Sequence, residues 1–179
     1  MDARTETLQE TAAVLRSMRG VWDEEAVDEL DHALQAAARA VDDGADDGLV
    51  LAAALHDLGR SPLVDQGDPR HDRVAREWLT PRFGHRVGWL AGAHVAAKRY
   101  LVATEPGYGD MLSEVSVATL REQGGAATDP AYLDHPWWPD ALRLRRYDDA
   151  AKDPAATRLT IAEVLTIAER VIRQTRRHD

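Results

Sequence analysis

A histidine followed directly by an aspartate, His56-Asp57, stands near the end of an apolar run that begins at Leu49. The run is helix-forming and apolar enough to be buried, and a buried His beside a buried Asp is costly unless a partner compensates both. Adjacent helical side chains point about 100° apart, so the two are poorly placed to bond to each other. Both can reach one metal ion over the helix end, and Gly59 lets the chain turn away. Taken alone, the pair fits a capped helix end equally well.

The histidines favour the metal site. Five of the seven fall between positions 32 and 94. Four of these lie on, or at the start of, segments with helical apolar spacing: His32, His56, His71 and His94. One buried histidine is usually structural, but four that converge beside an aspartate indicate a metal site, because helical bundles build such sites from inward-pointing side chains. The remaining three are expected away from it, at the surface (His85, His178) or in a Trp-rich loop (His135).

Composition limits the chemistry. The 179 residues include no cysteine, so a metal must be held by His, Asp and Glu, which favours iron, manganese, zinc or magnesium. The net charge of −9 argues against a nucleic-acid partner. No apolar stretch approaches the ~20 residues of a membrane helix, and the N-terminus lacks the apolar segment of a signal peptide. A cytoplasmic protein without a membrane anchor is therefore expected.

The apolar spacing predicts helices throughout the chain and no strand. The expected helices cover residues 5–19, 26–42, 49–57, 71–83, 87–100, 116–120, 141–152 and 159–176, with an irregular segment at 126–139. No linker or repeat interrupts them. We therefore expect residues 1–179 to form a single all-α domain.

Two cations lie one helical turn from candidate ligands. Lys98 follows His94 by four residues, and Arg145 precedes Asp148 by three. Each cation thus shares a helix face with a side chain that could bind metal. Alone, either would be a solvated surface residue. Together they predict an anion pocket that borders the metal.

The order of His32, His56-Asp57 and the distant Asp148 resembles that of HD-domain metal-dependent hydrolases. The resemblance covers most of the chain and implies an all-α HD-domain bundle with a metal site in its core. His71 and His94 are similar to the ligands that add a second metal in binuclear members, where Asp57 would bridge the two ions.

Three segments resemble one group within this superfamily, the mixed-valence diiron oxygenases that act on organophosphonates. They are residues 94–101, 116–125 and 144–152. In that family the positions that surround the phosphonate match Lys98, Ser116, Thr119, Gln123 and Arg145. Glu25 matches a residue that contacts the substrate amine. Trp22 replaces a tyrosine of the family, and it either stacks on a cationic substrate tail or belongs to the core.

The resemblance implies an oxygenase with two iron ions, Fe(II)/Fe(III), that uses O2 to cleave the C–P bond of a 1-hydroxyalkylphosphonate and release phosphate. His32, His56, Asp57 and Asp148 would hold one iron, and Asp57, His71 and His94 the other. Two alternatives remain open: a binuclear HD phosphohydrolase acting on a nucleotide or phosphate monoester, and a metal-stabilised binding or sensor module. The sequence does not determine the substrate tail, the oligomeric state or whether the pathway is catabolic or biosynthetic.

Overall fold

A computed structural model describes residues 2–23, 26–64 and 67–175. Over these ranges the chain forms nine α-helices, two short 3₁₀ helices and no strand, which confirms the predicted all-helical class. The elements are α1 (Ala3–Ser17), α2 (Glu29–Asp42), α3 (Asp47–Leu55), η1 (Leu58–Arg60), α4 (His71–Phe83), α5 (His85–Thr104), η2 (Gly109–Met111), α6 (Glu114–Glu122), α7 (Pro130–Leu133), α8 (Trp138–Ala150) and α9 (Ile161–Thr175).

Helix caps explain where the prediction was inaccurate. The second helix begins at Glu29 rather than residue 26, because the side chain of Asp28 accepts a hydrogen bond from the backbone N–H of Asp31 and caps it. The segment 126–139 is not wholly irregular, since it contains α7 and the start of α8. Pro130 and Pro139 both lie in the first turn of their helices, where proline needs no backbone donor.

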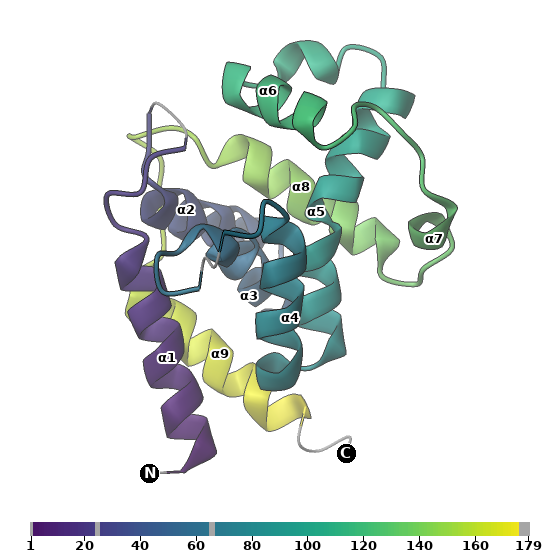
Figure 1. The fold of residues 1–179 in the computed structure, drawn as a ribbon. Helices are drawn as coiled ribbons and strands as arrows, with labels where there is room; N and C mark the ends of the chain where they lie inside the picture. Colours follow the sequence, from purple (N-terminus) through teal and green to yellow (C-terminus); the bar gives the residue numbers. More distant parts are fainter. Residues whose placement is uncertain (1, 24–25, 65–66, 176–179) are drawn as a thin grey trace.

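The core is built around α3. Every residue from Leu49 to Leu55 is buried, because neighbouring helices cover this helix on all sides. Helices α2, α5, α8 and α9 pack on it, while α4 and α5 form an antiparallel pair and α1 lies beside α9 (Figure 1). The start of α1 and the end of α9 lie toward the same end of the bundle (Figure 1).

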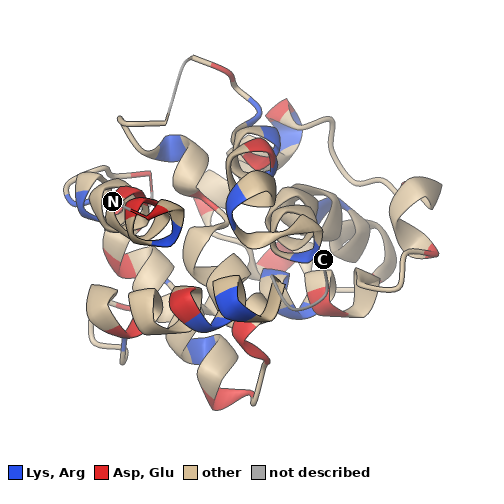
Figure 2. Ribbon diagram, turned by 90° about the horizontal axis from the view of Figure 1, so that it is seen from below, with Lys and Arg blue, Asp and Glu red and all other residues tan. Residues whose placement is uncertain are grey.

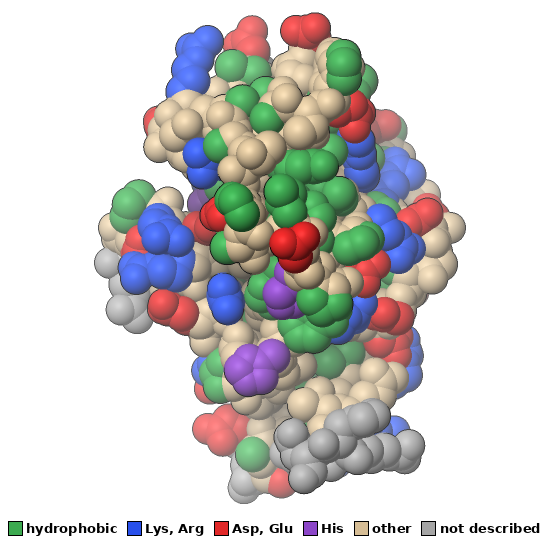
Figure 3. Space-filling view, turned by 90° about the vertical axis from the view of Figure 1, so that its right-hand side faces the viewer, with side chains coloured by type: hydrophobic (Ala, Val, Ile, Leu, Met, Phe, Trp, Pro, Cys, Tyr) green, Lys and Arg blue, Asp and Glu red, His purple; other side chains and the backbone are tan. Residues whose placement is uncertain are grey.

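The short helix α7 covers one side of α5 through aromatic contacts. The Trp89 ring stacks on His135 with 3.8 Å between ring centroids, and its centroid lies 5.7 Å from that of Tyr132. Hydrophobic side chains gather on this face between charged ones (Figure 3). His135 therefore packs against aromatic rings, and its expected place was outside the metal site.

Charged residues of both signs are distributed over the helices (Figure 2). Many of them pair, such as Arg86 with Asp46 and Asp140. No helix of the described part of the chain has the length and apolar character needed to cross a membrane.

Two glycines allow α4 and α5 to approach closely. A Cβ atom on Gly88 would lie 2.1 Å from Oγ1 of Thr80 and 3.0 Å from the carbonyl oxygen of Arg76. One turn later, a Cβ on Gly92 would lie 2.9 Å from Cβ of Arg76. Such separations are shorter than real contacts, so side chains at these positions would push the two helices apart.

Gly88→Val is therefore expected to lower the free energy of unfolding by roughly 1–3 kcal/mol, the usual cost of overpacking. Urea denaturation followed by circular dichroism measures this change. Gly109→Ala is the control, since a Cβ there meets only Cγ1 of Val102 at 3.6 Å. Equal midpoints for both variants would contradict the close packing.

Candidate metal centre and adjoining cavities

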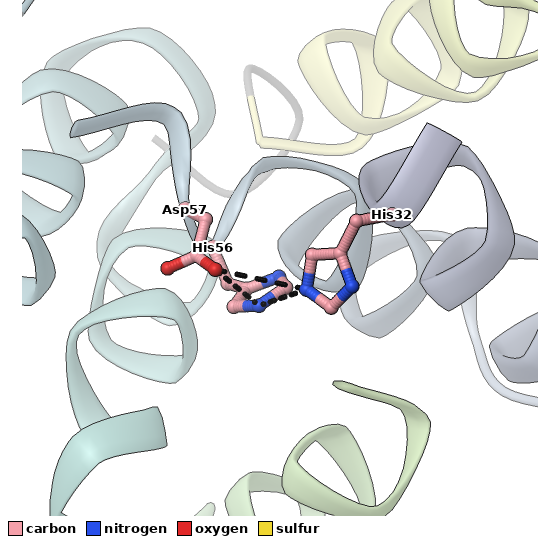
Figure 4. A group of neighbouring side chains, drawn as sticks. All are labelled: His32, His56 and Asp57. Atoms are coloured by element: carbon pink, nitrogen blue, oxygen red, sulfur yellow. Dashed lines mark hydrogen bonds and ion pairs between the residues drawn. The ribbon is translucent and has the colours of Figure 1, made fainter. Parts of the chain in front are cut away.

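The first group of candidate ligands combines α2 with the end of α3. His32 projects from the middle of α2, His56 follows the last residue of α3, and Asp57 comes next in the chain (Figure 4). Asp57 Oδ2 lies 3.2 Å from Nε2 of His56 and 3.6 Å from Nε2 of His32. These three atoms face one point and could hold a metal ion.

The second group uses the other oxygen of the same carboxylate. Asp57 Oδ1 lies 3.3 Å from Nε2 of His71, at the start of α4, and 3.4 Å from Nε2 of His94 in α5. The two Nε2 atoms are 3.1 Å apart. Asp57, His71 and His94 could therefore hold a second ion, with Asp57 between the two groups.

Backbone carbonyls orient the imidazole rings. The Nδ1–H groups of His32, His56 and His94 donate to the carbonyl oxygens of Ala151 (2.9 Å), Ala53 (2.8 Å) and Ala91 (2.6 Å). A carbonyl can only accept, so in the neutral ring the lone pair is on Nε2. This outer hydrogen bond is the usual support of a metal-binding histidine.

The charge state of the cluster also suits a cation. Burial raises the pKa of Asp57, but His56 and the other imidazoles outweigh it and hold that pKa well below its usual range. Burial lowers the pKa of His71 to about 4 against the attraction of Asp57, so this ring is neutral at pH 7. Burial lowers the pKa of His56, but Asp57 and Asp148 outweigh it and raise that pKa well above its usual value. The site thus offers an ionised carboxylate beside the neutral His71 ring and holds positive charge at His56, where a cation would lie.

These donors fit a metal pair. The Nε2 atoms of His32 and His56 lie 3.4 Å apart with their lone pairs facing, which requires a proton or a cation between them. Asp57 Oδ1 is buried and has no hydrogen-bond partner within the described residues. A buried carboxylate oxygen without a donor is costly, and a cation between it and His71 would remove that cost. Two histidines with one carboxylate suit non-haem iron.

Asp148, on α8, adjoins the first group. Its Oδ1 lies 3.4 Å from Nε2 of His32 and its Oδ2 lies 3.6 Å from Nε2 of His56. Arg145 donates to Asp148 Oδ2 at 2.6 Å and also pairs with Asp149. Burial raises the pKa of Asp148, but the Arg145 charge and the neighbouring histidines together outweigh burial and hold that pKa well below its usual range. The Arg145 charge is therefore already shared between two carboxylates.

A small cavity of about 40 Å³ borders both groups. Besides the ligands, its wall includes five of the residues predicted to bind an anion, Lys98, Ser116, Thr119, Gln123 and Arg145. Lys98 is buried and donates to Oγ1 of Thr119 at 2.9 Å, and Lys152 donates to Oγ of Ser116 at 2.9 Å. The wall therefore combines four carboxylates, Asp23, Glu29, Asp57 and Asp148, with four cationic side chains, Arg60, Lys98, Arg145 and Lys152. We call these four cationic side chains the cationic wall.

A larger cleft of about 530 Å³ adjoins this cavity on the side of α4, α5 and α6. The two share four wall residues: Arg60, His71, Thr119 and Gln123. A typical small-molecule pocket measures roughly 300–1,000 Å³, so the outer cleft has the size of a ligand site and the inner cavity does not.

The N-terminal candidates have different outcomes. Glu25 lies outside the described residues. Trp22 is 61% exposed, so the alternative in which it belongs to the core is wrong, while stacking on a substrate tail stays a prediction. Asp23 lies in the wall of the inner cavity of about 40 Å³, and Trp22 is not among its described wall residues. His178 also lies outside the described ranges, and His85, at the start of α5, is exposed as expected.

Five residues of the cavity wall were not predicted from the sequence: Asp23, Glu29, Arg60, Val115 and Lys152. Glu29 precedes His32 by three residues, which is the same one-turn spacing that selected Lys98. Lys152 follows Asp148 by four residues, although α8 ends at Ala150. Arg60 follows Asp57 by three residues within η1, and its side chain pairs with Asp23.

Gly59 brings the two ligand groups together. A Cβ atom at this position would lie 2.6 Å from the carbonyl oxygen of His71 and 2.9 Å from its Cα. Both are backbone atoms, which cannot rotate away. The absence of a side chain at Gly59 therefore lets η1 contact the first residue of α4 and places His71 beside Asp57.

Comparison with known proteins gives a consistent result, although no protein-family model matches the chain. A hydroxymethylphosphonate dioxygenase from Gimesia maris is 37% identical over 141 residues, which cover 72% of this chain and 70% of the relative. The glycine-betaine-forming [1-hydroxy-2-(trimethylamino)ethyl]phosphonate dioxygenase of Leisingera caerulea is 33% identical over 132 residues, covering 68% and 67%. An uncharacterised mimivirus protein, L432, is 33% identical over 136 residues, covering 69% and 62%.

The fold and the site define an all-helical protein whose buried core presents two His/Asp groups that share one carboxylate. Such a core is the kind in which helical proteins bind a pair of metal ions. The chain belongs to the family of phosphonate dioxygenases that its Gimesia and Leisingera relatives represent.

If both groups hold metal, Gly59→Ala is expected to move His71 out of the second group and lower the metal content by about one ion per chain. Elemental analysis of protein expressed with ample iron measures this, with circular dichroism as the check on folding. His94→Ala is the comparison and should show the same drop. Two ions in both variants would mean that the second group binds no metal.

Proposed function

We propose that this protein is a diiron oxygenase that uses O2 to cleave the C–P bond of a 1-hydroxyalkylphosphonate and release phosphate. The observation that carries the proposal is the sharing of Asp57 between two pairs of histidines, next to a cavity with a cationic wall. The names of the two dioxygenase relatives support oxidation of a phosphonate rather than hydrolysis of a phosphate ester.

The metal assignment follows the two groups. His32, His56, Asp57 and Asp148 would hold one iron, and Asp57, His71 and His94 the other. Bound iron would supply the activation of O2 and the oxidation of the carbinol carbon. The protein would hold the two ions at a fixed separation and keep each Nε2 lone pair directed at its ion through the carbonyl bonds to Nδ1.

The cationic wall would bind the phosphonate. Lys98 and Arg145 would contribute charge, and Ser116, Thr119 and Gln123 would contribute neutral hydrogen-bond donors. Because Arg145 already pairs with Asp148 and Asp149, we assign the larger share of the attraction to Lys98. Glu25 and Trp22 would face the substrate tail only if residues 22–25 lie over the cavity.

The atoms balance for hydroxymethylphosphonate. The compound and one O2 together contain the atoms of one formate and one phosphate, with the C–P bond broken and the carbon oxidised. The products together contain two more oxygen atoms than the substrate, which is the number that one O2 supplies. No further reductant enters the overall equation, so the residues need only bind and orient the substrate and exclude competing ligands.

Two further assignments remain proposals. We propose that residues 1–179 form one domain, which is supported by a single buried core that extends from Val14 in α1 to Ile172 in α9. A cytoplasmic location stays a prediction.

The oxygenase proposal predicts that hydroxymethylphosphonate is consumed only in air and only by iron-loaded protein, with one O2 used per phosphate released. An oxygen electrode and a phosphate assay measure the ratio. Methyl phosphate is the matched control, because it is a constitutional isomer of hydroxymethylphosphonate with a C–O–P linkage. We expect no turnover of it.

Release of phosphate from methyl phosphate without O2, at a rate comparable to that for the phosphonate, would identify a hydrolase instead. A hydrolase uses metal-bound water and is indifferent to O2. Protein loaded with manganese provides a second arm, in which the oxygenase should be inactive.

The Lys98 side chain predicts the pH dependence of substrate binding. Burial, together with the charge of Arg145, lowers the pKa of Lys98 to about 8. The ammonium group is charged below that pH and loses its charge above it, so kcat/KM for a phosphonate is expected to fall as pH rises past about 8. Rates measured from pH 6 to 10 at saturating O2 test this.

Lys98→Ala should raise KM roughly tenfold to a hundredfold, because it removes a charge-assisted contact. Lys98→Arg is the matched control, since a guanidinium stays charged across this range and should flatten the decline above pH 8. A decline that persists unchanged in Lys98→Arg would assign the titration to another group.

A further inference from the structure

The outer cleft and the inner cavity meet at Arg60, His71, Thr119 and Gln123. The inner cavity holds about 40 Å³ and the outer cleft about 530 Å³. A substrate whose phosphonate occupies the inner cavity therefore has room for further atoms only at this junction and beyond it. The chemistry of the junction should determine which substrate tails are accepted.

Two polar atoms at the junction lack hydrogen-bond partners within the described residues. They are Nε of Arg60, a donor, and Oε1 of Gln123, an acceptor, and both are buried. Nη1 of Arg60 pairs with Asp23, and Nε forms an ion pair with Asp57 Oδ1 at 3.7 Å, beyond hydrogen-bond range. A buried donor and a buried acceptor left without partners are costly, which points to a ligand group that serves both.

A hydroxyl is the group that fits. It accepts from the Arg60 Nε–H and donates to Oε1 of Gln123 at the same time. An ammonium group can only donate, and it would lie beside the Arg60 guanidinium. An ionised carboxylate can only accept, so it cannot satisfy Oε1 of Gln123.

The charges of the outer cleft also favour a neutral tail. Its wall carries three arginines and three acids: Arg60, Arg70, Arg99, Asp72, Glu122 and Asp129. The formal charges cancel, so the cleft as a whole attracts neither an anionic nor a cationic tail.

We infer that the junction of the two cavities binds a hydroxyl on carbon 2 of the substrate, so that the preferred substrate class is a 1,2-dihydroxyalkylphosphonate. Arg60 and Gln123 are the specificity-determining residues. The inference rests on the proposed function for the placement of the phosphonate and extends it to the substrate tail. It differs from the quaternary ammonium tail in the name of the Leisingera relative.

The test compares two compounds of nearly equal shape, 1,2-dihydroxyethylphosphonate and 1-hydroxypropylphosphonate, which differ by a hydroxyl in place of a methyl group. Iron-loaded wild-type protein is titrated with each in the absence of O2 by isothermal calorimetry. We expect the dihydroxy compound to bind roughly tenfold more tightly, and more tightly than 2-amino-1-hydroxyethylphosphonate.

Arg60→Met should reduce the ratio of the two affinities to about one, because it removes the donor and keeps an unbranched side chain. Arg70→Met is the control, since Arg70 lines the outer cleft but is not among the wall residues of the inner cavity, and the ratio should persist. Gln123→Leu provides a second variant. Its effect on the phosphonate is common to both compounds and cancels in the ratio.

Equal affinities in the wild type would overturn the inference and leave an ordered water as the partner of both atoms. An unchanged ratio in both Arg60→Met and Gln123→Leu would also overturn it. Because binding is measured without O2, failure to turn over any phosphonate in air would contradict the proposed function separately.

Discussion

The Asp57 carboxylate is the interaction on which the rest of the site depends. Its two oxygens face opposite pairs of imidazoles at 3.2–3.6 Å, so one side chain belongs to both halves of the centre. A lone ionised carboxylate in a helical core would be strongly destabilising. The surrounding bundle compensates it with four histidines that come from α2, the end of α3, α4 and α5, and the architecture therefore follows from the need to bring these four elements to one point.

Close approach of the backbone at three glycines also supports this convergence. Gly59 lets η1 contact His71, while Gly88 and Gly92 let α4 approach α5, and in each case a Cβ atom would be too close to its neighbour. Backbone carbonyl oxygens then orient the rings of His32, His56 and His94. The positions of the candidate ligands thus depend on glycines and backbone carbonyls, which are not candidate ligands themselves.

Much of this arrangement could be predicted from the sequence, for identifiable reasons. Helical periodicity predicted the elements that carry His32, His71 and His94, and the one-turn spacing predicted that Lys98 would share a face with His94. Spacing within one helix is a local property, so it survives without knowledge of the fold. The boundaries at 26–28 and 126–139 were less accurate, because caps and first-turn prolines act through single residues.

What the sequence could not supply were the contacts between distant segments. Arg145 donates to the hydroxyl of Tyr108, 37 residues away, and no local spacing indicates this contact. Arg60 was overlooked because its importance comes from lying between two cavities. The exposure of Trp22 was equally hidden, since an isolated tryptophan in a short connection has no periodicity from which burial can be inferred.

The attachment of α6 has a consequence for which molecules can enter the centre. This helix buries only Ser116 and Leu120, and its hydroxyls accept hydrogen bonds from the two lysines of the cavity: Thr119 from Lys98 and Ser116 from Lys152. Each of these hydroxyls thus occupies one N–H donor of a lysine ammonium group that faces the cavity. A neutral molecule offers the ammonium groups no more than the hydroxyls already do, whereas a dianion forms bonds about twice as strong. The bonds to α6 therefore hold both lysines in place, and the N–H groups that remain on each ammonium favour an anion over a neutral molecule.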